Sequence, residues 1–458
     1  MRRNEDDRIN IPLSKILILG FLIFLALHFF EKNKNAIETV EDEKDTVKTV
    51  TVKKQSNVRI SKMSLDDVTK TLAQNPPKLN SDRDTVAWNR GEIIRFFSID
   101  TSLQKRTATL VRRSNPKYGA AVALNPKTGQ VLAMVSYNDP ELPKLAENVA
   151  LSNKFPSASI FKTVTAAAAF EYTDISCSTQ LRFVGDNTTL YRRQFLPGEF
   201  GENANSISFA DAYARSNNPV FGWLALHRVG RNNLLKSALK FGYNAKIPFE
   251  MPTDISYFPE ATVGGLSTTN DSIHIAELGS GFNSETTLTP LLGALTAAAV
   301  INGGTMMVPT LVDSITDLSG KLLYSAKARK WRVVCTGDIA DSLNLVMQET
   351  TKSGSARNSF AAMRDFSRKR NGSSITYGGK TGTKDSHLGR NELFVGFTET
   401  TFTAEETETA DGKENDFSIA TSVCFVQRPM FIMRPSQVSA DIMLDYVRRK
   451  IRTVKDEQ

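Results

Sequence analysis

Three short segments carry side chains that together could perform acyl transfer through a serine. The first is Ser159-Ile160-Phe161-Lys162, in which a hydroxyl and an amine stand three residues apart. On a helix, this spacing places both side chains on one face of a turn. A lysine whose pKa is lowered by burial or by a second cation can take the proton of a serine hydroxyl. Free backbone N–H groups at the start of such a helix could bind the developing oxyanion.

The S-x-x-K pattern is a weak signal by itself because the chain contains three more copies of it. We predict that these copies are charged surface residues on helices or turns. They run from Ser102 to Lys105, from Ser114 to Lys117 and from Ser237 to Lys240. Only Ser159 opens a run, residues 159–172, that is almost entirely small or apolar after its first turn. That composition predicts a helix buried in the middle of a domain, where a catalytic group would be held rigidly.

The second segment is Ser216-Asn217-Asn218, which joins predicted helices at residues 209–215 and 220–229. Taken alone, Ser216 and Asn218 could simply cap helices, as these residue types often do. A catalytic role for them therefore depends on the other segments.

The third segment is Gly379-Lys380-Thr381-Gly382-Thr383, at the end of a strand predicted over residues 374–379. A phosphate-binding P-loop is the rival interpretation, but its spacing requires glycine where Ser374 stands and a helix where a strand is predicted. The similar tripeptide Lys127-Thr128-Gly129 belongs to a predicted hairpin turn.

The elements that must position these segments form two β blocks separated by a helical section. A strand at residues 92–99, a helix at 102–112 capped by Asp100 or Thr101, and a hairpin from 118–124 to 130–136 come first. Strands at 393–397 and 417–426 and an amphipathic helix at 436–451 come last, with further helices, including 290–301, between the blocks. The two β blocks must share one sheet, with the helical section as a second lobe, in an α+β protein.

Composition excludes several other classes of protein. A chain of 458 residues, 40% hydrophobic and 23% charged, can bury a large core. The net charge of +8 is spread along the chain, which favours a mildly basic surface and predicts no nucleic-acid partner. Cys177, Cys335 and Cys424 lie far apart, so we expect buried thiols with at most one disulfide and no metal site. With four histidines and no G-x-S-x-G or H-E-x-x-H motif, a catalytic base is predicted not to be histidine.

The N-terminus carries a targeting signal. Residues 11–30 are long enough to span a bilayer if Lys15 snorkels to the interface, and basic residues precede them. A cleaved signal peptide is the alternative, but residues 31–35 contain no small-residue cleavage site. We expect an uncleaved single-pass anchor in the cytoplasmic membrane, with the N-terminus in the cytoplasm and the rest of the chain outside.

The order S-x-x-K, S-x-N, K-T-G on a helix, a loop and a strand is the signature of penicillin-binding proteins and related serine β-lactamases. The chain resembles the transpeptidase domain of that family, particularly the C-terminal half of its class A members, over residues 91–451. The resemblance extends to residues 98–104, 119–136, 155–162 and 390–397. It implies the penicillin-binding/serine β-lactamase-like fold, with a central antiparallel sheet flanked by helices and a mainly helical lobe.

The resemblance also implies catalytic roles. Ser159 would attack the carbonyl between the last two D-alanines of a peptidoglycan stem peptide, with neutral Lys162 as the general base. Ser216 would relay a proton to the leaving amine. Asn218 would hold Lys162 and the substrate amide, and Lys380 would lower the pKa of Lys162.

For substrate binding, the resemblance implies the segment Thr381, Gly382 and Thr383. The two threonines would bind the terminal carboxylate of the donor. Backbone N–H groups of Ser159 and Thr383 would form the oxyanion hole, and the extended donor would add to the strand edge.

The implied division of the chain is a cytoplasmic tail (residues 1–10), an anchor (11–30), a stalk or linker (31–90), a lead-in segment (91–115) and the transpeptidase domain (116–458). The stalk rests on the polar composition of residues 33–82 and the Asn75-Pro76-Pro77 break. Neither a glycosyltransferase domain nor a class B pedestal fits between residues 30 and 91, so a separate glycan polymerase is an expected partner.

The implied function is that of a D,D-transpeptidase that cross-links stem peptides and is acylated by β-lactams. Alternatives are a D,D-carboxypeptidase or endopeptidase, and a non-catalytic sensor of β-lactams or peptidoglycan. No Ω-loop carboxylate is evident in the sequence, which favours a transpeptidase over a β-lactamase. No cofactor or metal is expected.

Overall fold

The computed structural model describes residues 62–74, 85–87, 93–195, 204–259, 269–369, 374–401 and 417–456. Residues 60–458 form one compact unit, and residues 1–59 are assigned to another. The predicted anchor at residues 11–30 lies outside the described ranges. Within those ranges, no helix combines the length and the apolar character needed to cross a membrane.

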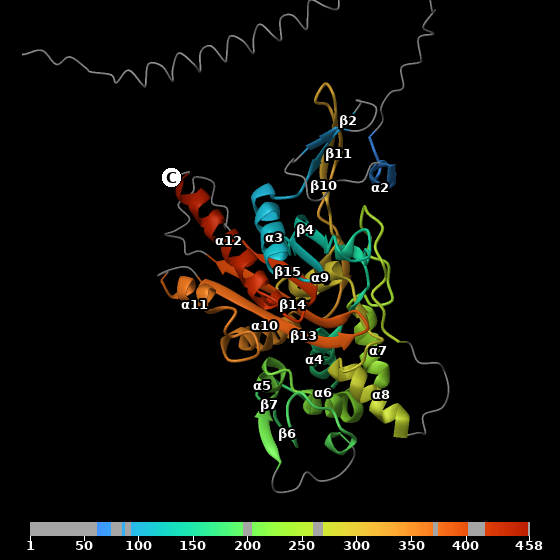
Figure 1. Cartoon of the computed structure of the whole chain (residues 1–458), viewed down its shortest axis with the longest axis vertical. Helices are drawn as coiled ribbons and strands as arrows, with labels where there is room; N and C mark the ends of the chain where they lie inside the picture. The colour runs from blue at the N-terminus through green and yellow to red at the C-terminus, as the bar shows by residue number, and fades with distance from the viewer. Residues whose placement is uncertain are drawn as a thin grey trace, which may run out of the picture. The chain divides into compact units, whose positions relative to one another are not determined.

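A five-stranded antiparallel sheet lies at the centre of this unit (Figure 1). Its strands run in the order β13, β14, β15, β3, β4, with the bounds Ser374–Ser386, Gly389–Thr401, Ile419–Val426, Tyr118–Leu124 and Val131–Asn138. The two β blocks meet where β15 pairs with β3, with Val423 opposite Ala121. The prediction that both blocks share one sheet is therefore confirmed for the hairpin and the late strands. It is wrong for the strand predicted at residues 92–99, because the strand Ile93–Phe97 pairs in a different sheet.

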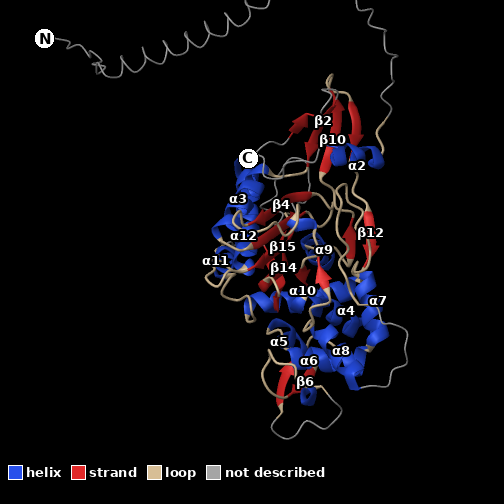
Figure 2. Ribbon diagram, turned by 45° about the vertical axis from the view of Figure 1, so that its right-hand side comes forward, coloured by secondary structure: helices blue, strands red, loops and turns tan. Residues whose placement is uncertain are grey.

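Side-chain alternation along the strands gives the sheet two buried faces. On β3, Ala120 and Val122 face one core, whereas Ala121 and Ala123 face the other. Helix α9 (Pro290–Val300) covers the first face, and helices α3 (Thr101–Arg113), α11 (Ala361–Arg368) and α12 (Pro435–Asp456) cover the second (Figure 2). A strand between two covered faces must be apolar on both sides. The sequence of β3 fits this position, because all seven of its residues are buried and most are small or branched.

The helical lobe surrounds a buried central helix. It contains the 3₁₀ turn η2 (Ala158–Phe161) and helices α4 (Lys162–Tyr172), α5 (Phe209–Ala214), α6 (Asn218–Leu224), α7 (Arg231–Lys240), α8 (Thr269–Ser280) and α10 (Gly337–Lys352). Within α4, the four alanines from Ala166 to Ala169 are almost completely excluded from solvent. The helix predicted over residues 220–229 instead divides into α6 and a π-helical turn, η4 (Ala225–Val229), ended by Gly230 at φ 76°.

A second, smaller sheet was not predicted. Strands β1 (Thr85–Ala87), β2 (Ile93–Phe97), β10 (Val312–Asp317) and β11 (Leu322–Ser325) form it, and helix α2 (Leu65–Gln74) packs on it. The sequence predicted no fold in residues 33–82, yet Val68 and Leu72 of α2 are buried against Ile315. Most of the apolar surface that stabilises α2 comes from β10 and β11, more than two hundred residues later, so local composition gave no sign of it.

Short ladders and turns complete the described structure. The ladders pair β5 (Phe155–Pro156) with β8 (Thr287–Leu288), β6 (Gln180–Phe183) with β7 (Asn205–Ser208), and β9 (Thr305–Met307) with β12 (Lys330–Val333); the 3₁₀ turns are η1 (Val149–Leu151) and η3 (Arg192–Gln194). Cys177, Cys335 and Cys424 all carry free thiols.

Asp100 links helix α3 to the C-terminal helix α12, and its removal should lower stability. Its carboxylate accepts the N–H of Leu103 at 2.9 Å as the cap of α3 and receives Arg449 Nη1 of α12 at 3.0 and 3.1 Å. We expect Asp100→Ala to reduce the free energy of unfolding by about 1–2 kcal/mol, from the lost cap and a partly exposed ion pair. Thermal unfolding should show a lower midpoint. Asp445→Ala, which removes only the i,i+4 partner of Arg449, is the control, and an equal loss there would contradict the capping role.

Candidate active site

Ser159 lies where an irregular turn enters the buried helix. Ser157 donates its N–H to Thr286 O at 2.8 Å, and Ala158 has φ 47°, a left-handed conformation that turns the chain abruptly. Gly281 packs so closely against this turn that a Cβ there would lie 2.0 Å from Ala158 O. Ser159 is the second residue of η2, which continues into α4. The result is a partly exposed hydroxyl at the start of an otherwise buried helix.

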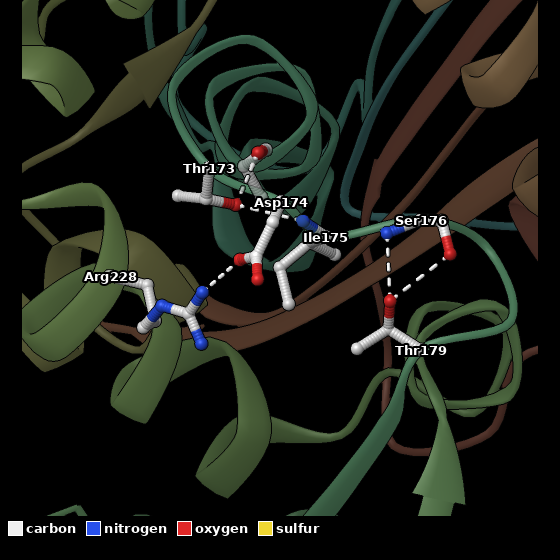
Figure 3. Close-up of polar contacts among 7 residues, drawn as sticks. Thr173, Asp174, Ile175, Ser176, Thr179 and Arg228 are labelled. Carbon is white, nitrogen blue, oxygen red and sulfur yellow. Dashed lines mark hydrogen bonds and ion pairs between the residues drawn. The ribbon is translucent and has the colours of Figure 1, made fainter.

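The far end of this helix is held by polar contacts (Figure 3). Thr173 Oγ1 donates to Ala169 O at 2.6 Å and accepts the N–H of Ile175 at 3.2 Å. Asp174, the next residue, forms an ion pair with Arg228 of η4. These contacts fix α4 at the end opposite Ser159, so both ends of the helix are anchored.

Lys162 is completely buried and its amine contacts three oxygens. Nζ lies 2.9 Å from Ser159 Oγ, 2.6 Å from Asn218 Oδ1 and 2.5 Å from Ser280 O. Burial, followed by the nearby charge of Lys380, holds the pKa of Lys162 well below its ordinary value. A neutral amine at this distance can accept the proton of the Ser159 hydroxyl.

Lys380 is a second buried lysine, on β13. Its Nζ lies 3.0 Å from Thr381 O and 5.6 Å from the centre of the Tyr213 ring. Burial lowers the pKa of Lys380 to about 7. In the described part of the chain, neither Lys162 nor Lys380 forms an ion pair with a carboxylate. An anionic ligand would therefore find uncompensated positive charge here, and its binding would favour protonated Lys380.

The Ser216-Asn217-Asn218 segment crosses between α5 and α6, as predicted. The capping role belongs to Asn217, whose Oδ1 accepts the N–H of Val220 at 2.8 Å. Ser216 has φ 59° and is partly exposed. Asn218 instead reaches inward, with Oδ1 at Lys162 and Nδ2 donating to Thr188 O at 2.9 Å. The structure thus separates the cap from the two residues proposed for chemistry.

Gly382 allows the strand β13 to approach the nucleophile turn. A Cβ at Gly382 would lie 3.1 Å from Ile160 Cγ1 and 3.3 Å from Ala158 Cβ, tighter than ordinary contact. Residues 374–386 form one continuous strand, so the P-loop alternative is wrong. β13 is also the edge of the sheet in the described structure, so an extended peptide could pair with it.

Ser355 is a further hydroxyl that the sequence analysis missed. Its Oγ lies 2.6 Å from Thr381 Oγ1, and its N–H donates to Ala214 O at 3.0 Å. A Cβ at the preceding Gly354 would lie 2.4 Å from Ala214 O, so this turn after α10 joins the end of α5 to β13. The only sequence signal was a Gly-Ser pair after a helix, which is equally typical of a plain helix end.

The other S-x-x-K pairs lack this environment. Lys240 forms an ion pair with Glu171 at 2.5 Å. Burial acts to lower the pKa of Lys240, but the interaction with Glu171 outweighs burial, so the pKa of Lys240 lies above its ordinary value. Ser114 Oγ donates to Leu110 O at 2.8 Å as part of a helix end, and Ser102 is exposed on α3. Within the described ranges, no group of three or more His, Cys, Asp or Glu side chains is placed to hold a metal.

A serine hydroxyl against a buried lysine, beside a second lysine on an edge strand, forms a candidate serine–lysine active site between a sheet and a helical lobe. The family model of the penicillin binding protein transpeptidase domain matches residues 119–407, more than half of the chain. The chain belongs to this family.

Curated relatives agree with that assignment. The chain is 30% identical over 227 residues to the peptidoglycan D,D-transpeptidase PbpA of Mycobacterium tuberculosis, covering 44% of each protein. It is 22% identical over 317 residues to the stage V sporulation protein D of Bacillus subtilis, covering 65% of this chain and 46% of that one. The chain thus matches less than half the length of these relatives.

Solved structures share the fold. The D,D-transpeptidase domain of a peptidoglycan glycosyltransferase from Eggerthella lenta has a TM-score of 0.58 at 21% identity, covering 83% of this chain and 86% of that one. Penicillin-binding protein A from M. tuberculosis, as an imipenem acyl-enzyme complex, has a TM-score of 0.56 at 20% identity, covering 77% and 80%. The penicillin-binding transpeptidase fold, with its mixed α/β architecture and central antiparallel sheet, is therefore confirmed.

Proposed function

We propose that this protein is a peptidoglycan D,D-transpeptidase that works through a Ser159 acyl-enzyme and is acylated by β-lactams. The observation that carries the proposal is that the buried Lys162 amine lies 2.9 Å from Ser159 Oγ and is hydrogen-bonded to Asn218. The family assignment and the transpeptidase names of the relatives support it.

In the first half of the reaction, neutral Lys162 takes the Ser159 proton as Oγ attacks the penultimate D-alanine carbonyl. The amine of Lys162 is held in place by two hydrogen bonds that it donates, one to Asn218 Oδ1 and one to the backbone carbonyl of Ser280. The proton then passes to the leaving D-alanine amine, with Ser216 as the relay. Because Lys162 begins neutral, the transfer creates an ammonium that its three oxygen neighbours stabilise.

The donor is anchored on β13. Its terminal carboxylate binds Thr381 and Thr383 in the positive potential of Lys380, and Gly382 leaves space for strand and turn to meet. Backbone N–H groups of Ser159 and Thr383 bind the oxyanion. Ser355, 2.6 Å from Thr381 Oγ1, orients that hydroxyl toward the carboxylate.

Product analysis tests the proposal. The full chain is incubated with a D-alanyl-D-alanine stem pentapeptide and an amine-bearing stem tetrapeptide, and products are identified by mass spectrometry. We expect a cross-linked dimer with release of D-alanine, and none with Ser159→Ala. Release of D-alanine with only the shortened monomer would instead assign a carboxypeptidase.

We also propose that residues 11–30 anchor the chain in the cytoplasmic membrane with the catalytic unit outside, beside a separate glycan polymerase. The apolar run and its basic flank support this arrangement. Protease added to spheroplasts should digest residues beyond 31 while a cytoplasmic marker stays intact. Protection of the catalytic unit, in cells whose known exterior proteins are cut, would contradict this topology.

A further inference from the structure

The end of helix α8 and the residues after it, 280–286, lie against the nucleophile turn, and we call this segment the α8 strap. Its first residue, Ser280, is fully buried, and its backbone O accepts a hydrogen bond from Lys162 Nζ at 2.5 Å. The next residue, Gly281, packs so tightly that an added Cβ would lie 2.0 Å from Ala158 O. The strap therefore contacts both the general base and the turn that carries the nucleophile.

Local hydrogen bonds fix the geometry of the α8 strap. Gly281 has φ 67°, and the N–H of Phe282 donates at 2.8 Å to the backbone O five residues earlier, so α8 ends in a Schellman motif. Asn283 Oδ1 accepts the N–H of Thr286 at 2.7 Å. Thr286 O in turn accepts the N–H of Ser157 at 2.8 Å. Because the strap is fixed along its length, a contact that holds its middle also holds its first carbonyl.

Lys384 of β13 contacts the middle of the α8 strap. Its Nζ donates to Phe282 O at 2.9 Å and lies 4.5 Å from the centre of the Phe282 ring. An ammonium in this position gains both a charge-assisted hydrogen bond and a cation–π contact. Among the residues that the structure describes, no carboxylate forms an ion pair with Lys384. The ammonium is therefore directed to the strap rather than to an acidic side chain.

The place of Lys384 in β13 explains why its side chain reaches the strap. Side chains two residues apart on a strand lie on the same face, so Lys384 shares a face with Lys380 and with Gly382, the residue that approaches the nucleophile turn. The backbone at this position is also fixed, because Asn391 Nδ2 of β14 donates to Lys384 O at 3.1 Å. The strap is thus held from a rigid point on the strand that carries the second active-site lysine.

The position of the Ser280 carbonyl matters because acylation creates a buried charge. When Lys162 takes the proton of Ser159, it becomes an ammonium, and the oxygens that stabilise it must already be in place. Ser159 Oγ is then bonding to the acyl carbon, so the other two oxygen contacts of the amine are Asn218 Oδ1 and Ser280 O. A strap that moved would weaken one of these two contacts at the moment when the charge appears.

We propose that Lys384 is a positioning residue for the acylation reaction. By donating to Phe282 O, Lys384 holds the α8 strap in the place where its first carbonyl accepts the Lys162 amine. The inference rests on the proposed function, in which Ser159 forms an acyl-enzyme. In this role Lys384 acts through the strap and not on the substrate, so it changes the rate of proton transfer and leaves the binding of a β-lactam or donor peptide unchanged.

Stopped-flow acylation of the full-length protein by a fluorescent penicillin separates rate from binding. One concentration series gives both the acylation rate at saturating drug and the dissociation constant of the initial complex. Lys384→Met keeps the length of the side chain but removes the donor. We expect the saturated rate to fall about tenfold, as loss of a charge-assisted hydrogen bond predicts, and the dissociation constant to stay within about twofold. Lys384→Arg can still donate to Phe282 O, so its saturated rate should lie within about threefold of the unmodified protein.

Lys117→Met is the matched control. Lys117 Nζ also donates to a backbone O, that of Leu388 at 3.3 Å, but at the turn between β13 and β14 rather than at the strap, so this variant should keep the normal saturated rate. An unchanged rate in Lys384→Met would overturn the proposal, as would equal losses in Lys384→Met and Lys384→Arg.

Other outcomes would assign Lys384 a different role. A higher dissociation constant at an unchanged saturated rate would overturn the proposal and indicate that Lys384 binds the drug directly. A smaller fraction of labelled protein, with a normal rate for that fraction, would also overturn it, because loss of folded protein alone gives this result. Failure of the proposed function would look different, because then even the unmodified protein would resist acylation, and the inference would fail with it.

Discussion

Ser159→Ala should abolish covalent labelling by a fluorescent penicillin, with a loss on the order of 10⁴-fold or more in acylation rate. Among the serines that the structure describes, only Ser159 combines a buried lysine at 2.9 Å, the start of a helix and an edge strand with a second buried lysine. A β-lactam presents the carbonyl and carboxylate of D-alanyl-D-alanine, so labelling reports on the nucleophile, the oxyanion hole and the β13 anchor together. Mass spectrometry of the labelled protein should place the adduct on the peptide that contains Ser159.

The chain provides its own matched controls for this result. Ser102→Ala, Ser114→Ala and Ser237→Ala change the first residue of the other S-x-x-K copies, and each should label normally. The adduct should persist for many minutes, since in the described structure no carboxylate is hydrogen-bonded to Ser159 or Lys162 to activate a water. An adduct on another serine would refute the nucleophile assignment, and rapid release of the drug would indicate a β-lactamase.

Lys162→Arg should reduce acylation by on the order of 10²- to 10⁴-fold, the usual contribution of a general base. The guanidinium keeps its proton in proteins and cannot accept one from Ser159. Penicillin acylation measured by stopped flow gives the rate. Lys240→Arg is the control, because Lys240 is held charged by Glu171 and should tolerate the change. Acylation near the normal rate in Lys162→Arg would exclude Lys162 as the base.

The pH dependence of acylation should reveal the coupling between the two lysines. Acylation needs neutral Lys162, so the rate falls as pH drops through the pKa of Lys162. Burial is the larger cause of its low pKa and the charge of Lys380 the smaller. Lys380→Gln removes only the second cause, so the pKa of Lys162 rises and the acidic limb of the profile moves to higher pH. A limb that stays in place, or moves to lower pH, would contradict this coupling.

Local patterns in the sequence determined much of the fold. The apolar run after Ser159 predicted the buried helix α4, the Pro/Gly turn between residues 118 and 136 predicted the hairpin of β3 and β4, and Asp100 was one of two proposed caps for α3. These features are visible because side-chain periodicity and turn chemistry act over a few residues. The order of the three motifs indicated the protein family. The family resemblance in turn predicted that Ser159 and Lys380, about 220 residues apart, belong to one site.

Tertiary structure alone decided the features that depend on distant neighbours. Helix α2 is stabilised by β10 and β11, and Ser355 meets Thr381 only because the turn after α10 reaches β13. The low pKa of Lys162 has the same origin. The sequence determined that a lysine stands one turn after Ser159, but desolvation and the charge of Lys380 arise from segments that only folding brings around it, so its proton affinity is a property of the packed structure.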